Sequence, residues 1–329
     1  MLKRRTFIGT ALGAAAVSAM PRFSRAHIMT NFKIYDTHGH FYTDDFKNYP
    51  VDGRTNRRGP DELKARVAAD PKTPARVFPE WEACNISRGA AVQYGSAYSN
   101  DNRYVVDICK QYPDRLRAIC ILDENDAKTP ATIERMTKQD KISGIRFRGF
   151  APQGQTIHTF LSDNAAEIWQ TANNLGIAIV LMPHTRVEDR PAILNRMGEL
   201  AAKYPNVNVI LDHMAFPQPI RGHRTFGFYQ EHFELQKLDN VYYKFTSLLV
   251  EQMEQAHVPP DAFLQYATMI FGSKKMIWGS DYGNTAGRLI DLTHMALESA
   301  EGLSLEDKKA LFFDTADKIH VAGGRGPKA

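Results

Sequence analysis

The stretch from Ile177 to His213 reads IAIVLMPHTRVEDRPAILNRMGELAAKYPNVNVILDH, and it contains the unit that repeats along most of the chain. It begins with one apolar run, Ile177–His184, and ends with another, Val207–His213. Short, continuous apolar runs rich in Val and Ile are typical of strands that are buried on both faces of a parallel sheet. Between them, Arg190–Tyr204 repeats apolar residues at helical spacing. The stretch therefore predicts a strand, a helix and a second, parallel strand.

The same alternation extends over most of the chain. Six further runs have the length and composition of buried strands: Lys33–His38, Gly89–Tyr94, Leu116–Leu122, Gly144–Phe150, Val241–Leu248 and Met276–Asp281. Helical patterns fall between the runs: Asn102–Tyr112, Thr129–Lys138, Asp163–Leu175, Pro259–Phe271 and Gly287–Ala300. Eight such units over about 250 residues match a closed (β/α)8 barrel, or TIM barrel. The alternative, an open doubly wound sheet, normally begins with a Gly-rich turn that Asp36–His40 lacks.

Composition and charge narrow the class of protein. The 329 residues are 43% hydrophobic, which excludes an intrinsically disordered chain and supplies a sizeable core. The 41 Lys and Arg exceed the 37 Asp and Glu by four, but five of these cations lie in residues 1–26, which contain no acid. Residues 27–329 therefore carry one net negative charge, and nothing in this balance favours binding to nucleic acid.

Residues 1–26 have the order of a secretory signal. Cations at Lys3–Arg5 precede a small-residue apolar run, Thr10–Met20, and Ser24–Ala26 supplies small residues before a cleavage point. The paired arginines followed by Thr-Phe-Ile resemble a bacterial twin-arginine signal, which implies the twin-arginine export machinery and the periplasm. An uncleaved anchor is the alternative, but the run is too short and too rich in Gly and Ala for a typical membrane span. We therefore divide the chain into a signal peptide, 1–26, and a barrel domain, 27–329, without stable membrane association.

A long polar connection separates the first two predicted strands. Thr43–Pro79 contains one helix candidate, Pro60–Ala69, and several Pro, Gly and Arg residues. A connection of this length is uncommon unless it forms a lid or a binding segment. The sequence leaves open whether it has such a role or is a surface insertion.

Two histidines follow each other at strand spacing in Asp36–His40. His38 and His40 share one face because side chains alternate along a strand, and they lie at the carboxyl end of the first strand. In a barrel this end is the active-site mouth. Two imidazoles in this arrangement suit zinc or another transition metal. The alternative is a pair of structural histidines without a ligand.

Three other predicted strands also end in titratable residues. His184 ends the fifth run, His213 the sixth and Asp281 the eighth. The carboxyl ends of all barrel strands converge on one mouth, and a packed barrel has no structural need for these side chains there. The set therefore predicts an active site rather than isolated polar residues.

The fourth predicted strand carries two arginines on one face. Arg146 and Arg148 are two residues apart, and their planar guanidinium groups suit a carboxylate. They predict an anionic substrate, with structural salt bridges as the alternative. Arg224, in the loop after the sixth run, and Tyr282, after the eighth, are further candidates for substrate binding.

Taken in order, these motifs resemble the amidohydrolase superfamily, in particular the amidohydrolase-related branch that includes lactone hydrolases and some decarboxylases. The resemblance covers nearly the whole chain after the leader, and it is carried by Asp36–His40, Gly144–Arg148, Leu211–Met214 and Trp278–Tyr282. It implies that His38 and His40 bind one divalent metal ion with help from His184 and Asp281, and that His213 is the catalytic histidine.

One departure from the family concerns the number of metal ions. Binuclear members carry a carboxylated lysine on the fourth strand, where this chain has Arg146 and Arg148. A mononuclear site is therefore expected, with zinc as the first choice and manganese as the second. Lactonases of this branch that act on aromatic-derived lactones also work without metal, which leaves a metal-free mechanism open.

The leading hypothesis is a metal-dependent hydrolase that opens a lactone, or a related cyclic ester or amide, of a carboxylated small molecule. Asp281 would take the proton from an activated water, and His213 would polarise the attacked carbonyl. A metal-dependent decarboxylase and a metal-independent lactonase are the near alternatives. A periplasmic binding protein without catalytic activity is the distant one. Fold alone does not separate these reactions.

Overall fold

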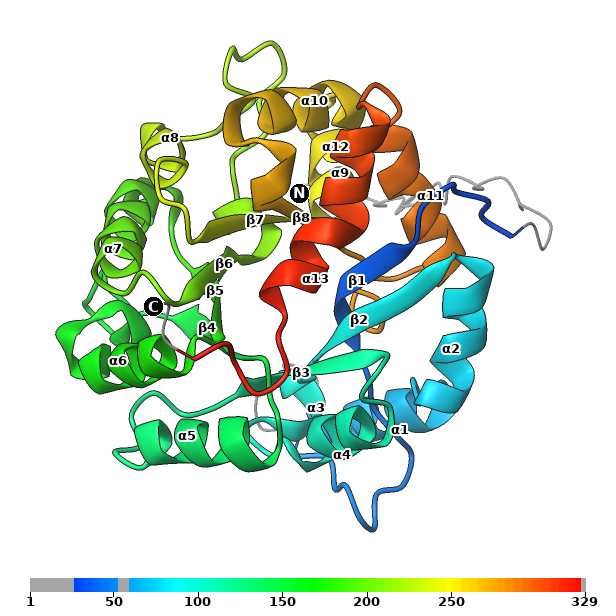
Figure 1. The fold of residues 1–329 in the computed structure, drawn as a ribbon, viewed down its shortest axis with the longest axis vertical. Coiled ribbons are helices and arrows are strands. Elements are labelled where there is room, and N and C mark those ends of the chain that lie inside the picture. Colours follow the sequence, from blue (N-terminus) through cyan, green and yellow to red (C-terminus); the bar gives the residue numbers. More distant parts are fainter. Residues whose placement is uncertain (1–26, 53–58, 327–329) are drawn as a thin grey trace, which may run out of the picture.

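Eight parallel strands form one sheet that curves into a nearly closed barrel (Figure 1). The structure is a computed structural model that describes residues 27–52 and 59–326. Each strand pairs with the next in chain order, so the predicted parallel βα units are confirmed and the fold fits a TIM barrel. The strands are β1 Ile34–His40, β2 Ile86–Val92, β3 Leu116–Ile121, β4 Gly144–Phe150, β5 Ala178–His184, β6 Asn208–Leu211, β7 Val241–Thr246 and β8 Met276–Gly279.

Helices surround the sheet (Figure 1). They are α1 Pro60–Ala69, α2 Pro74–Ala83, α3 Gly95–Tyr98, α4 Arg103–Gln111, α5 Thr129–Gln139, α6 Ala166–Leu175, α7 Arg190–Lys203, α8 Gln230–Leu235, α9 Ser247–Gln255, α10 Pro260–Phe271, α11 Leu289–Ser299, α12 Leu305–Lys309 and α13 Thr315–Ile319. Both α1 and α2 lie in the connection between β1 and β2, and α2 was not expected from the sequence. No helix among the described residues is long and apolar enough to cross a membrane.

The domain has two hydrophobic cores, one outside the ring of strands and one inside it. The larger core fills the space between the strands and the outer helices. The smaller core lies inside the barrel and includes Ala178, Val180 and Ile210 together with Ile319 of α13. Because Ile319 also accepts a hydrogen bond from Asn208 at the start of β6, α13 closes the end of the barrel where the strands begin. The opposite end, where the strands run out, is therefore left for polar residues.

A buried carboxylate joins the first strand to the last. Asp36 of β1 accepts hydrogen bonds from the backbone N–H of Ser280 at 2.8 Å and from the Ser280 hydroxyl at 2.5 Å. It also accepts from the backbone N–H of His38 at 3.0 Å. Burial raises the pKa of Asp36 above its usual value, and these donors offset only part of that rise. Thr37 adds a bond of 2.6 Å to the carbonyl of Trp278, so side chains supply much of the hydrogen bonding across this seam.

A glycine allows the seam to close. A Cβ atom on Gly279 would lie 2.6 Å from Cβ of His38, which is too close for any residue with a side chain. Just beyond it, the backbone N–H of His40 donates to the carbonyl of Tyr282 at 2.9 Å. The close approach of β8 to β1 thus carries the histidines of β1 to the residues that follow β8.

The two strands that were predicted to end in His213 and Asp281 stop earlier in the structure than the sequence suggests. β6 stops at Leu211 and β8 at Gly279. His213 and Asp281 follow them with φ angles of 51° and 54°, which lie in the left-handed region and cannot continue a strand. The predicted signal peptide, 1–26, lies outside the described residues.

The seam generates a stability prediction. Asp36→Asn keeps the shape of the side chain but replaces one accepting oxygen with a donor that faces other donors. Because a buried polar group is then left unpaired, we expect the free energy of unfolding to fall by about 1–3 kcal/mol. Urea denaturation measures the change. Ser280→Ala is the matched control and should cost less, because the backbone bonds to Asp36 remain; equal stability of wild type and Asp36→Asn would contradict this account of the seam.

Candidate active site

Two histidines and an aspartate converge where β1 meets the residues after β8. The Nε2 atoms of His38 and His40 lie 3.5 and 3.3 Å from Oδ1 of Asp281. The three residues are 0%, 4% and 2% exposed. One ligand atom from each lies within 4.8 Å of the others, so the group could hold a metal ion. We refer to His38, His40 and Asp281 as the metal group.

Neighbouring hydrogen bonds aim these ligand atoms at one point. Nδ1 of His40 lies 3.0 Å from the carbonyl of Val92, to which it donates, so the lone pair of Nε2 faces the centre. Oδ2 of Asp281 accepts from Asn284 at 3.0 Å and from the Thr285 hydroxyl at 2.7 Å, which leaves Oδ1 free. Both ring nitrogens of His38 are buried and have no hydrogen-bond partner among residues 27–52 and 59–326. These features fit a bound cation.

The charge states favour the same interpretation. Burial lowers the pKa of His38 well below its usual value, so its imidazole is neutral and can act as a ligand. Burial alone would raise the pKa of Asp281, but its hydrogen bonds and the neighbouring His40 and His213 hold the pKa below the usual range. A neutral imidazole beside an ionised carboxylate is the state that a divalent cation requires.

A left-handed turn places His213 beside the metal group. The four residues His213–Phe216 have φ angles between 51° and 56°, an unusual run for residues with side chains. The ring of His213 lies 5.6 Å from that of His38, and its Nδ1 is 2.7 Å from the hydroxyl of Thr246. Burial lowers the pKa of His213 to about 4, so this ring is also neutral near pH 7.

His232 holds this turn in place. Its Nδ1 accepts from the backbone N–H of Tyr229 at 3.1 Å, and its Nε2 lies 3.0 Å from the carbonyl of Met214, within the turn. Because Nδ1 accepts, Nε2 must carry the proton and donate. Strained backbone persists only where its surroundings determine it, and His232 supplies part of that support.

Three charged side chains are buried beneath the metal group. Asp212 lies 2.8 Å from Nζ of Lys244 and 2.7 Å from Nε of Arg146. Burial alone would raise the pKa of Asp212, but the two cations lower it to about 2. His38, Asp212 and His213 form a second group with metal-ligand spacing. Because an ammonium and a guanidinium already neutralise Asp212, the geometry favours one metal ion rather than two.

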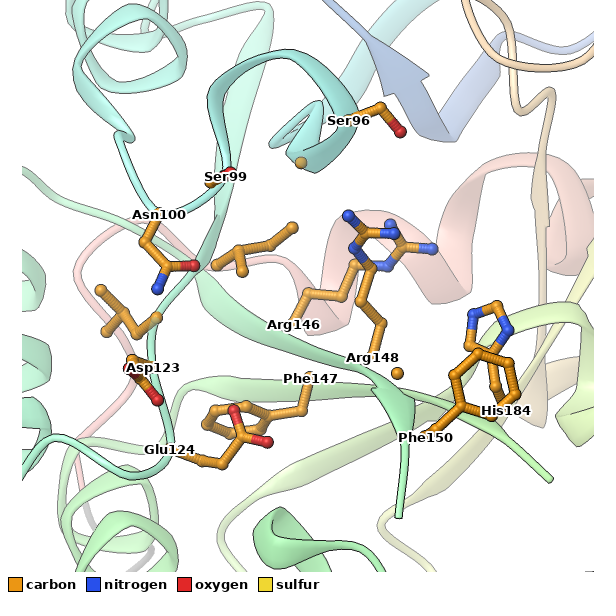
Figure 2. Close-up of a pocket in the computed structure, with 14 residues that line it drawn as sticks. Ser96, Ser99, Asn100, Asp123, Glu124, Arg146, Phe147, Arg148, Phe150 and His184 are labelled. Atoms are coloured by element: carbon orange, nitrogen blue, oxygen red, sulfur yellow. The ribbon is translucent and has the colours of Figure 1, made fainter. Parts of the chain in front are cut away.

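A cavity of about 760 Å³ opens at the ends of β2 to β5 (Figure 2). No residue of the metal group lines it, but Arg146 in its wall pairs with Asp212, which lies 3.6 Å from Nδ1 of His38. Arg146 and Arg148 both line it, which brings the two predicted arginines together. Arg146 is engaged with Asp212, whereas the half-buried side chain of Arg148 has no hydrogen bond or ion pair within the described part of the chain. Burial and the neighbouring Arg146 lower the pKa of Arg148. A cation left unpaired in a cavity is suited to an anionic ligand.

The sequence profile of the amidohydrolase family matches residues 35–319, most of the chain. The chain belongs to this family. No curated protein matches it. Many solved structures resemble it, and at the low identities of the three given below they establish the fold alone.

One is described as a 2-pyrone-4,6-dicarboxylic acid hydrolase from Pseudomonas putida (19% identity, TM-score 0.65, 88% of this chain and 98% of that one). The second is an amidohydrolase from Burkholderia multivorans with bound zinc (17% identity, TM-score 0.65, 88% and 99%). The third is 5-carboxyvanillate decarboxylase from Novosphingobium aromaticivorans, complexed with manganese (14% identity, TM-score 0.62, 91% and 99%).

In this amidohydrolase His184 lies apart from the metal group, contrary to its predicted place among the ligands. It belongs to neither of the groups with metal-ligand spacing in the described chain; it lines the cavity, and its ring is 5.0 Å from that of Phe150. Strand register explains the difference. Met182 faces the inside of the barrel and contacts Arg146. His184 is two residues farther along the same face of β5, where it pairs with Phe150 at the end of β4.

The two remaining candidates for substrate binding also lie away from the arginine pair. Arg224 is exposed on the loop after β6 and does not line this cavity. Tyr282 lines a different cavity, where its hydroxyl donates to Glu80 at 2.8 Å and accepts from Lys72 at 2.8 Å. Of the residues predicted to bind substrate, Arg146 and Arg148 therefore share the cavity.

Asp212 and Lys244 are buried site residues that lie outside the set of catalytic, metal-binding and substrate-binding residues predicted from the sequence. Each lies two positions beyond a residue of the inner core, Ile210 or Tyr242, on the same face of its strand. The available signal was a charged residue continuing an inward-facing apolar series on two neighbouring strands. That signal indicates that Asp212 and Lys244 are buried, but it does not show that they pair with each other. The register of β6 and β7 brings them together.

The metal group generates a binding prediction. Metal-depleted protein should take up one equivalent of zinc, and His40→Ala should weaken binding at least about 100-fold because it removes a ligand. His184→Ala is the matched control and should change the affinity by less than about threefold, since the ring of His184 lies outside the metal group. Isothermal titration of zinc measures both. Equal losses in the two variants, or two zinc ions per chain, would contradict this assignment.

The buried His232 generates a pH prediction. Burial lowers its pKa from 6.5 to about 4. Between these values the unfolded chain binds a proton that the folded chain does not, so His232 makes stability fall as the pH drops, by up to ~1.4 kcal/mol per pH unit. His232→Gln keeps a donor and an acceptor but does not titrate, so its stability should fall less steeply between pH 6.5 and 4.5.

Urea denaturation of metal-depleted protein measures this slope. The exposed His223→Gln serves as the control and should follow the wild type. Identical slopes for wild type and His232→Gln would show that His232 does not stay neutral in the folded protein.

Proposed function

We propose that this amidohydrolase uses one divalent metal ion to open a lactone, or a related cyclic ester or amide, of a carboxylated small molecule. One observation carries the proposal: three ligand atoms converge in the metal group, and Asp212 and Arg146 link this group to a cavity that holds the unpaired cation of Arg148. The arginine supports an anionic substrate, and the metal group supports activation of water.

His38, His40 and Asp281 would hold the ion, with zinc as the first choice and manganese as the second. A divalent ion supplies a water of lowered pKa and polarises a carbonyl. Oδ1 of Asp281 faces the same point and would accept the proton of the attacking water, then pass it to the departing oxygen or nitrogen. In the metal-free alternative, Asp281 acts on water directly.

His213 would stabilise the carbonyl oxygen as negative charge develops on it. When the hydroxyl of Thr246 donates to Nδ1, the proton of the ring is on Nε2, and Nε2 is then a donor. Because the ring is neutral and fixed by the left-handed turn, this donor needs little rearrangement. Arg148 would bind the substrate carboxylate and orient the ring to be opened.

A metal-dependent decarboxylase is the second candidate. The unpaired cation of Arg148 also suits a carboxylate that is itself the leaving group. In that reaction Asp281 would deliver a proton to the carbon that loses carbon dioxide, and no water would be consumed. Incorporation of oxygen from labelled water into the product supports the hydrolase, and release of carbon dioxide supports the decarboxylase.

Export is also part of the proposal. The order of charged, apolar and small residues in 1–26 supports a twin-arginine signal and a periplasmic location. The proposed partners are this export machinery and a small-molecule substrate.

The proposal generates a kinetic prediction. Asp281→Asn should lower kcat by about 10²–10⁴-fold because it removes the proton acceptor. Turnover would be followed with a panel of carboxylated lactones, and bound metal would be measured on the same samples so that loss of the ion is seen separately. His257→Gln, at an exposed position outside the metal group and the lining of the cavity, should retain wild-type turnover. Full activity of Asp281→Asn would exclude both the metal-assisted and the metal-free mechanism.

A further inference from the structure

We propose that Glu124 makes the cavity selective for a ligand that carries one carboxylate and, at its other end, a hydrogen-bond donor such as an ammonium or hydroxyl group. The carboxylate half of this inference rests on the proposed function. The new part is the role of Glu124 on the opposite wall of the same cavity. We expect Glu124 to discriminate between such ligands and dicarboxylates of the same size.

Charges of opposite sign face the cavity from different sides. Figure 2 shows Arg148 on one side with His184 and Phe150, and Glu124 on the other with Asp123 and Asn100. Like Arg148, Glu124 is half-buried. Neither side chain forms an ion pair among residues 27–52 and 59–326, and they do not pair with each other. Two partly desolvated, unpaired charges are costly unless a ligand satisfies them.

Glu124 is better placed to meet a ligand than its acidic neighbour. Oδ1 of Asp123 accepts from the backbone N–H of Asn125 at 2.9 Å and from its side-chain amide at 3.2 Å, so this carboxylate is engaged in a local turn. Glu124 has no such bond from a neighbouring side chain. Burial and the nearby Asp123 raise the pKa of Glu124, which is the effect expected for a carboxylate that lacks a cation.

Apolar side chains also line the cavity, among serines and an asparagine. Ile121, Leu122 and Phe147 line the cavity together with the charged residues. A ring fits against such walls, with a carboxylate toward Arg148 and a donor toward Glu124. A second carboxylate on that ring would meet Glu124 and be repelled, so the arrangement selects by attraction at one end and by repulsion at the other.

Two inert probes of matched shape test the inference. The first, 4-(aminomethyl)benzoate, carries a carboxylate and an ammonium group across one ring, and the second, terephthalate, carries two carboxylates. Isothermal titration into zinc-loaded, full-length protein should show the zwitterion binding at least about tenfold more tightly, because a charge-assisted hydrogen bond replaces a like-charge contact. Glu124→Gln should reduce this preference to less than about threefold, and Glu124→Lys should reverse it. Glu167→Gln, an exposed glutamate on α6, is the matched control and should preserve it.

The outcomes separate this inference from the proposed function. Equal binding of the two probes to wild type, or the same preference in Glu124→Gln, would overturn the role of Glu124. The carboxylate site would still stand if Arg148→Gln weakened both probes. If neither probe binds wild type, the cavity is not a carboxylate site, and the inference falls together with the anionic substrate of the proposed function.

Discussion

The join between β1 and β8 is the constraint on which the active site depends. His38 and His40 belong to the first strand and Asp281 follows the last, so the metal group exists only where the ends of the barrel meet. Asp36 holds this join through bonds to both sides, and Gly279 lets the backbones approach. One acidic side chain therefore serves the fold and, indirectly, the chemistry.

The interior of the barrel is apolar at one end and charged at the other. Its closed end is apolar and covered by α13, whereas its open end holds buried charges. Charges this deep persist because each has a partner: Asp212 lies against both Lys244 and Arg146. The ion pair with Asp212 fixes the position of Arg146, which also lines the cavity. The position of the cavity wall relative to Asp212 is therefore fixed as well.

Sequence patterns predicted the barrel and much of the site for a physical reason. Parallel strands buried on both faces produce long apolar runs, and polar residues at their ends stand out, as His38, His213 and Asp281 do. The patterns did not reveal the left-handed turn at His213–Phe216, because no glycine marks it. They also did not show that His184 lies outside the metal group, or that Arg224 and Tyr282 lie away from the arginine pair, because residue order does not determine how far a strand extends above the barrel or where a loop folds back.

The distribution of cations links the metal count to the type of substrate. In a site with two metal ions, Asp212 would be available as a ligand; here Lys244 and Arg146 neutralise it. Arg146 is thereby withdrawn from substrate binding, although it lines the cavity. Arg148 remains as the unpaired cation of that wall, and a single guanidinium group matches a single carboxylate. The buried charges therefore favour both one metal ion in the metal group and one anionic group on the substrate.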